Sequence, residues 1–116
     1  MGRRASNEIV LILWRDIPAQ VTGRQGDDKH SVVLPHRFQK AIDRAAMVAE
    51  RKTAQEYVAE MRRTTHPLTG ELVATVDALA ASIEREFTNE RLHQLIEHGG
   101  WDPASPDSHP QEGTPA

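Results

Sequence analysis

The chain has 116 residues, of which 38% are hydrophobic and only 4% aromatic, so it can form one small domain with a mainly aliphatic and alanine core. It contains no cysteine, which excludes disulfides, thiolate metal sites and a cysteine nucleophile. No apolar run approaches the roughly 20 residues of a membrane-spanning helix, and no signal-peptide core follows the basic start. We therefore expect a cytoplasmic protein without a membrane partner.

The acidic excess of the chain is confined to its last residues. The formal net charge is −3, and residues 101–116 contain Asp102, Asp107 and Glu112 but no lysine or arginine. Without this segment the chain has 14 acidic residues (17 less 3) and 14 basic ones, and a neutral domain disfavours nucleic acid as a partner. The segment also holds four of the seven prolines. We therefore expect one domain over residues 7–100 and a disordered, acidic, proline-rich tail over residues 101–116.

The first part of the chain has the pattern of strands. Residues 8–14 form a continuous apolar run, as in a strand that is covered on both faces, and Pro18 suits the start of the next strand. Residues 17–22 then alternate between apolar and polar, which predicts a half-buried strand and an antiparallel hairpin. Residues 23–29 contain two glycines and two aspartates and predict a loop, and residues 31–34 predict a third strand.

Two helices are predicted next. The first begins at Pro35, whose missing N–H costs nothing at a helix start, and apolar residues recur at helical spacing as far as Ala49. The second begins at Thr53, where a Thr-x-x-Glu capping box is present, and its apolar stripe extends to Met61. Residues 65–70 include a proline and a glycine and indicate a break.

The clearest helical pattern follows this break. Leucine, valine, isoleucine and phenylalanine recur every three or four positions over residues 72–87 and predict a third helix. Thr88 or Asn89 caps a short fourth helix, which Gly99 and Gly100 end. The whole chain predicts an α+β fold, in which a small antiparallel sheet of two or three strands packs one side against three to four helices.

Two segments form a distinctive signature. They are Trp-Arg-Asp-Ile-Pro-Ala-Gln-Val at residues 14–21 and Ala-Ile-Asp-Arg-Ala-Ala-Met at residues 41–47, with Arg37-Phe38 between them and Tyr57 after them. Together they resemble the small bacterial family labelled "virulence factor", and the resemblance extends from about residue 9 to residue 61. The family label names a phenotype and implies no chemistry.

The resemblance implies an accessory role. Similar domains in other bacteria are part of a larger protein with iron–sulfur-scaffold-like and helical-repeat sections. Stand-alone versions often neighbour genes for one-carbon metabolism that depends on folate or corrinoid. The resemblance therefore implies a non-enzymatic interaction domain with a larger protein partner, in the manner of an auxiliary component of a one-carbon enzyme system.

The corner after the first strand has two interpretations. Trp14, Arg15 and Asp16 can form a recognition site, in which the arginine binds a carboxylate or phosphate, the aspartate orients it and the tryptophan forms an apolar wall. The corner can equally be structural, with Asp16 accepting backbone hydrogen bonds and Arg15 paired with Asp16 or Asp43. Gln20 can take part in either arrangement.

The first predicted helix has a basic flank. It consists of Arg37, Lys40, Arg44 and Arg51, and it can receive phosphates, polyglutamate tails or an acidic partner, or remain a solvated face. Asp43, next to Arg44, can fix a pocket by meeting Arg15. The alanines of this helix allow close approach of the sheet, or of a second chain in a homo-oligomer.

The remaining motifs do not indicate catalysis. The spacing of the six histidines puts no two imidazoles on one helix face, so no metal site is expected. No nucleophile elbow, Walker loop or dinucleotide fingerprint is present, so no cofactor is expected. The alternative to an interaction domain is a protein that binds a small folate-like or phosphate-like anion through Trp14, Arg15 and the basic flank. A weaker alternative is a small enzyme that uses Arg15, Asp16 and His36.

Overall fold

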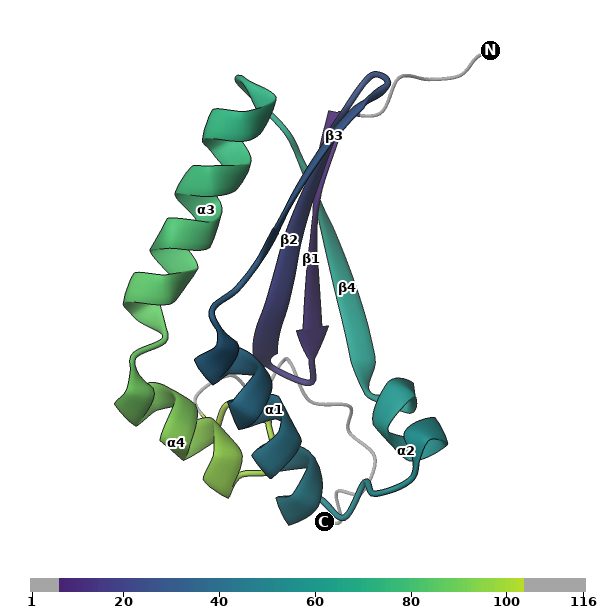
Figure 1. The fold of residues 1–116 in the computed structure, drawn as a ribbon, viewed down its shortest axis with the longest axis vertical. Coiled ribbons are helices and arrows are strands. Elements are labelled where there is room, and N and C mark those ends of the chain that lie inside the picture. Colours follow the sequence, from purple (N-terminus) through teal and green to yellow (C-terminus); the bar gives the residue numbers. More distant parts are fainter. Residues whose placement is uncertain (1–6, 104–116) are drawn as a thin grey trace.

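The computed structural model describes residues 7–103, which form a four-stranded antiparallel sheet and four helices (Figure 1). The strand order in the sheet is β3-β2-β1-β4. This arrangement confirms the predicted α+β class and adds one strand to it. The elements in chain order are β1 (Asn7–Trp14), β2 (Ile17–Gln25), β3 (Asp28–Val33), α1 (His36–Val48), α2 (Ala54–Ala59), β4 (Met61–Pro67), α3 (Leu72–Glu86) and α4 (Asn89–Glu97).

The predicted hairpin is confirmed, but the predicted loop over residues 23–29 is wrong. β2 continues to Gln25, β3 begins at Asp28, and the turn between the two strands has only two residues. The loop prediction relied on Gly23, which serves a different purpose. A Cβ at Gly23 would lie 2.5 Å from Cγ2 of Val76, so glycine lets α3 pack closely on the strand.

The fourth strand was not predicted from the sequence. Met61 was assigned to the second helix and residues 65–70 to a break, whereas α2 ends at Ala59 and β4 pairs antiparallel with β1. β4 is an edge strand, and its residues between Met61 and Pro67 are arginine, threonine and histidine. A strand without apolar alternation gives no periodic signal, and here the pairing with β1 determines its structure.

The helix starts agree closely with the sequence prediction. Pro35 is the N-cap of α1 rather than its first residue, and Thr53 and Glu56 form the capping box of α2. Thr88 caps α4 by accepting a hydrogen bond from the backbone N–H of Arg91. Gly99 and Gly100 follow α4 with positive φ, which ends the helix as predicted.

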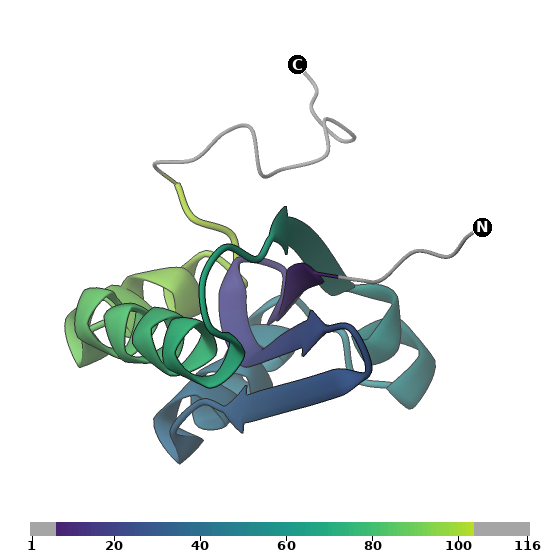
Figure 2. The same ribbon diagram turned by 90° about the horizontal axis from the view of Figure 1, so that it is seen from above.

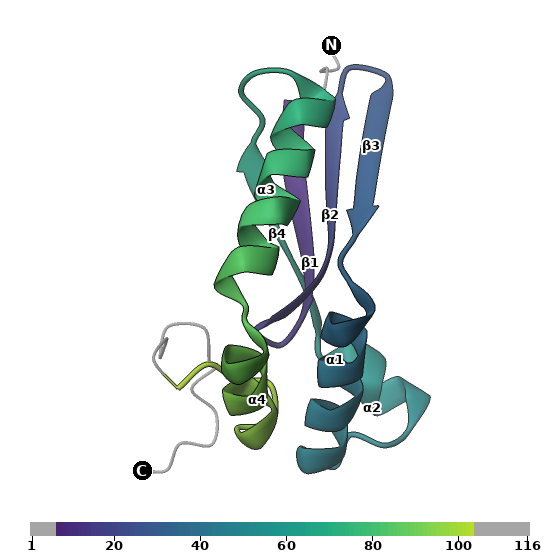
Figure 3. The same ribbon diagram turned by 60° about the vertical axis from the view of Figure 1, so that its left-hand side comes forward.

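The helices occupy two positions around the sheet. α3 runs along one face over β2 and β3, whereas α1, α2 and α4 lie at the end where β1 ends (Figures 1 and 3). α1 and α4 lie side by side, and α1 contacts α4 more extensively than it contacts β2. Seen from above, α3 and α4 lie on the same side of the sheet (Figure 2). The alanine face of α1 therefore accommodates mainly a neighbouring helix.

The two faces of the sheet differ. Ile9 and Val21 face the helices and belong to the hydrophobic core. Val10 and Ile12 lie on the other face, alongside Gln20 and Thr22 of β2. No helix packs on that face within residues 7–103, so the prediction that both faces of the first strand are covered is wrong. On this open face Val10 is nonetheless only 9% exposed.

Candidate functional site

The guanidinium of Arg15 is buried inside the corner. It lies between the rings of Trp14 and Trp101, at 5.2 and 5.1 Å from their centroids, and only 8% of the residue is exposed. One terminal nitrogen donates to the carbonyl of Gly99 at 3.0 Å, and the other donates to Oε2 of Glu60 at 3.1 Å. Arg15 thus connects the β1–β2 turn to the segments after α4 and before β4.

Asp16 makes a second set of connections in the same corner. Its Oδ1 accepts a hydrogen bond from Arg62 at 2.8 Å, and its Oδ2 accepts one from the backbone N–H of Asp102 at 2.7 Å. The Asp16 N–H donates to the carbonyl of Gly100 at 2.9 Å. Trp101 and Asp102, which the sequence prediction placed in the tail, therefore contact the domain; residues 104–116 of the predicted tail lie outside the described residues.

The carboxylate of Glu60 receives two arginines. Arg15 and the Nε of Arg51 both contact Oε2, at 3.1 and 3.0 Å. Burial by itself raises the pKa of Glu60, but the hydrogen bonds and positive charges of the two arginines outweigh it, and the net pKa lies below its usual value of 4.5. Glu60 therefore stays ionised, and the charge of Arg15 is balanced inside the protein.

The structural interpretation of the corner is the one that the geometry supports. Trp14 is fully buried, and its Nε1 donates to the carbonyl of Tyr57 at 2.8 Å. Arg15 is paired with Glu60, so the predicted pairing of Arg15 with Asp16 or Asp43 is wrong. Asp43 is exposed and accepts a hydrogen bond from Gln39 instead. A ligand could reach Trp14 or Arg15 only if the corner opened.

Arg37 also has a structural role. Its guanidinium donates to the carbonyls of Phe87 and Glu84, the latter at 2.9 Å, at the carboxyl end of α3. These carbonyls lack partners within the helix, and a cation there also interacts favourably with the helix dipole. Arg51 is held by Glu60, so two members of the predicted basic flank hold the fold together.

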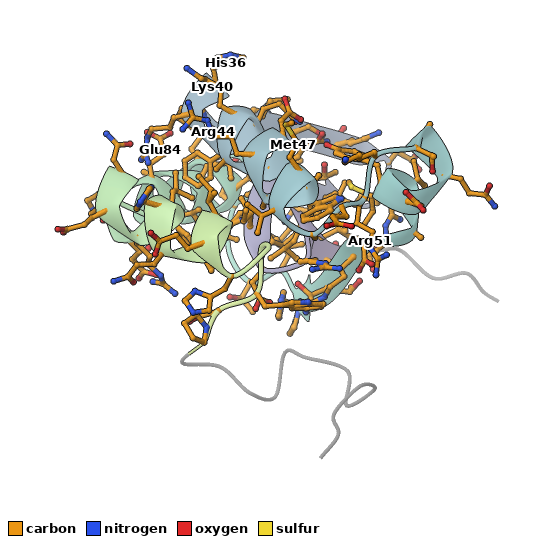
Figure 4. The ribbon with its side chains drawn as sticks, turned by 90° about the horizontal axis from the view of Figure 1, so that it is seen from below. His36, Lys40, Arg44, Met47, Arg51 and Glu84 are labelled. Atoms are coloured by element: carbon orange, nitrogen blue, oxygen red, sulfur yellow. The ribbon has the colours of Figure 1, made fainter. Side chains whose placement is uncertain are left out.

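The other two members of the flank are exposed and available. Lys40 and Arg44 have no hydrogen-bond or ion-pair partner among residues 7–103. Figure 4 shows them in sequence along the outer side of α1, between His36 and Met47. Met47 is 68% exposed, which places an apolar side chain beside the two cations.

A shallow groove lies between this row and α4. Its volume is about 210 Å³, with a floor of Ala41, Leu92 and Ile96. Arg37, Lys40 and Arg44 line it from α1, and Asn89 and His93 line it from α4. We call Lys40, Arg44 and Met47 together with this groove the α1 site. The α4 residues were not predicted to take part, because only the packing of α4 on α1 brings them together.

A second hollow lies on the open face of the sheet, away from every predicted site residue except Gln20. Its volume is about 420 Å³. The residues that line it are Glu8, Val10, Ile12, Gln20, Thr22, Arg24, Lys29 and Arg63. Within residues 7–103 no three histidine, aspartate or glutamate side chains lie close enough together to hold a metal ion.

These features define a class of protein: a small α+β domain whose signature corner is internally paired and which, within residues 7–103, has exposed, unpartnered cations on α1 and on the open face of its sheet. In the described part of the chain, no helix is long and apolar enough to cross a membrane. The model of the family described as "Virulence factor" matches residues 12–96, which is most of the chain. The chain therefore belongs to the virulence factor family, and the match extends beyond residue 61 into α4, to residue 96. No curated protein and no solved structure matches it.

Proposed function

We propose that this protein is a non-enzymatic interaction domain that binds an acidic segment of a larger protein at the α1 site. The observation that carries this proposal is a contrast between two pairs of cations that lie on α1 or just after it. Arg37 and Arg51 are held by carbonyls and a carboxylate of the domain, whereas Lys40 and Arg44 are exposed and unpartnered within the described range. Exposed cations beside an apolar surface suit a partner that supplies carboxylates.

The composition of the α1 site indicates what the partner segment contains. Carboxylates would pair with Lys40 and Arg44, each contact contributing about 1.5–3 kcal/mol where water is excluded. An apolar side chain would enter the groove over Leu92 and Ile96, and the exposed Met47 would offer a further apolar contact beside the groove. The expected partner segment therefore carries acidic residues on both sides of a leucine-like anchor. Components of one-carbon enzyme systems, which the family resemblance implies, are the first partners to test.

The same groove supports a second candidate function, the binding of a small phosphate-like or folate-like anion. The cations and the apolar floor would suit such a ligand. However, drug-sized ligands occupy pockets of roughly 300–1,000 Å³, and the groove measures about 210 Å³. It admits one side chain or a phosphate rather than a folate, which favours the partner segment.

The experiment places a photo-crosslinking amino acid at Met47 in the full chain, expressed in its own organism. We expect one discrete adduct, mapped by mass spectrometry to an acidic segment of the partner. Lys40→Glu with Arg44→Glu should abolish the adduct. A matched reversal elsewhere, Lys52→Glu with Arg85→Glu, should leave it unchanged, because both side chains are exposed and outside the α1 site.

Two results would contradict the proposal. One is an adduct that persists after the Lys40 and Arg44 reversal in a folded protein. The other is an adduct that maps to a segment without carboxylates. If the proposal holds, the affinity between the purified partner and the original chain should fall as the salt concentration rises. The affinity of the reversed variant should not depend on salt in this way.

A further inference from the structure

The open face of the sheet has its residues arranged in rows across the strands. Glu8, Arg24 and Lys29 form one row, because Glu8 pairs with Arg24 and Arg24 pairs with Lys29. Two residues further along β1, Val10 lies between Thr65 and Thr22, and Thr22 pairs with Ser31. In the last row Ile12 lies between Arg63 and Gln20, and Gln20 pairs with Val33.

The first row places two cations directly opposite each other. Arg24 of β2 and Lys29 of β3 are cross-strand partners on the same face. Like charges in this position destabilise a sheet. Glu8 faces Arg24 from the other side, yet neither cation has an ion-pair or hydrogen-bond partner within residues 7–103. The two neighbouring cations repel each other and so destabilise the folded sheet. An anion bound between them would remove this repulsion.

A third cation lies at the opposite end of the hollow. Arg63 comes from β4 in the last row, and it too is unpartnered within the described range. The first and last rows are four residues apart along β1, which corresponds to about 13 Å. The open face therefore has positive charge at both ends of the hollow. One carboxylate, that of Glu8, lies at the end that holds Arg24 and Lys29.

Between these ends the floor is recessed and mixed in character. Val10 and Thr22 are only 9% and 8% exposed, although no helix covers them. Gln20 donates to the hydroxyl of Thr22 at 3.0 Å, and this hydroxyl lies 2.9 Å from that of Ser31. The hollow of about 420 Å³ above this floor falls within the range of small-ligand pockets.

We propose that this hollow binds an elongated small molecule with an anionic group, carboxylate or phosphate, at each end. Arg24 and Lys29 bind one group and Arg63 binds the other. The middle of the molecule lies on Val10 and Ile12 and accepts or donates a hydrogen bond at Gln20. Single-stranded nucleic acid is disfavoured, because stacking of bases needs aromatic side chains and none of the five in the chain lines the hollow.

The site is independent of the α1 site. The two share no residue, and the open face lies on the side of the sheet that α3 does not cover (Figure 2). Each can therefore be tested while the other is intact, and failure of one proposal leaves the other standing.

The test uses three probes at fixed ionic strength: suberate with a carboxylate at each end, hexane-1,6-diol bisphosphate with a phosphate at each end, and hexanoate with one carboxylate. Amide chemical shifts of the full-length, isotope-labelled protein report binding. We expect saturable shifts at Val10, Thr22 and Ser31 with at least one of the two-ended probes, and at least tenfold weaker binding of hexanoate. The stronger of the two-ended probes identifies the anionic group.

Variants assign the cations. Arg24→Gln with Lys29→Gln should weaken binding at least tenfold, and Arg63→Gln should reduce the preference for two-ended probes over hexanoate. The matched control, Lys52→Gln with Arg85→Gln, removes the same charge from exposed positions outside both sites and should leave binding unchanged. The first double variant should also melt at a slightly higher temperature, because it relieves the repulsion between paired cations. Shifts that do not saturate, equal binding of hexanoate, or an equal loss of binding in the Lys52 and Arg85 control would overturn the proposal.

Discussion

The corner formed by Trp14, Arg15 and Asp16 and the exposed side of α1 both carry cations of the family signature, but in opposite environments. Arg15 lies close to the rings of two tryptophans and is paired with Glu60, whereas Arg44 is exposed with no partner in the described range. The signature therefore combines residues that hold the fold with residues that are free to bind. A distinctive motif marks residues that have a role. Their burial and their pairing show whether that role is to stabilise the fold or to bind another molecule.

The largest effect that separates the two regions is on stability. Arg15→Ala removes the more buried of the two arginines that pair with Glu60, and it also removes the hydrogen bond to Gly99, so it should cost about 1.5–3 kcal/mol of unfolding free energy. Arg44→Ala should change stability by less than about 0.5 kcal/mol. Urea unfolding of both variants measures the difference. Equal, small losses would show that the corner contributes little.

Arg15→Lys refines this comparison. Lysine keeps the charge but lacks the planar fork that reaches both Gly99 and Glu60. We expect a loss between those of the alanine variant and the original chain, and a loss as large as that of alanine would assign the effect to geometry rather than charge.

A pH dependence comes next in size. The folded-state pKa of Glu60 lies below its usual value of 4.5, so the unfolded state binds the proton more readily and unfolding free energy rises with pH. The contribution of Glu60 is complete above the usual value and is lost as the pH falls through the folded-state pKa. The stability difference between the original chain and Glu60→Gln should therefore shrink as the solution is acidified.

Glu56 provides a control for this measurement. Backbone N–H groups of Thr53 and Lys52 hold the pKa of its carboxyl below the usual value as well, but the group is exposed at the start of α2. Glu56→Gln should retain most of the acid dependence that Glu60→Gln loses. An acid dependence that is identical in the two variants would contradict the assignment to the corner.

The smallest expected stability effect is at the α1 site. Lys40→Gln with Arg44→Gln should change the unfolding free energy by less than about 0.5 kcal/mol, because neither side chain has a partner to lose within residues 7–103. Thermal unfolding at low and high salt checks this. A clear loss at low salt would mean that the two cations stabilise the fold and would weaken the proposed binding role.

Local chemistry made several elements predictable. The capping box at Thr53 and Glu56, the Thr88 cap and the glycines after α4 are encoded within a few residues, and the structure has all of them. The regular apolar spacing of α3 was equally readable. In contrast, β4 carries no apolar alternation, and it is a strand because β1 offers it a backbone edge.

The sequence by itself determined the family, the α+β class, the hairpin and the basic flank of α1. Only the tertiary structure decided which of those cations are available: Arg37 reaches the carbonyls of α3, Arg51 reaches Glu60, and Lys40 and Arg44 reach no partner among the described residues. It also placed Arg24, Lys29 and Arg63 around one hollow. The physical reason is that helix caps and apolar periodicity act between near neighbours in the chain. The pairing of a charge depends instead on groups such as Gly99, 84 residues away from Arg15, that only folding brings within reach.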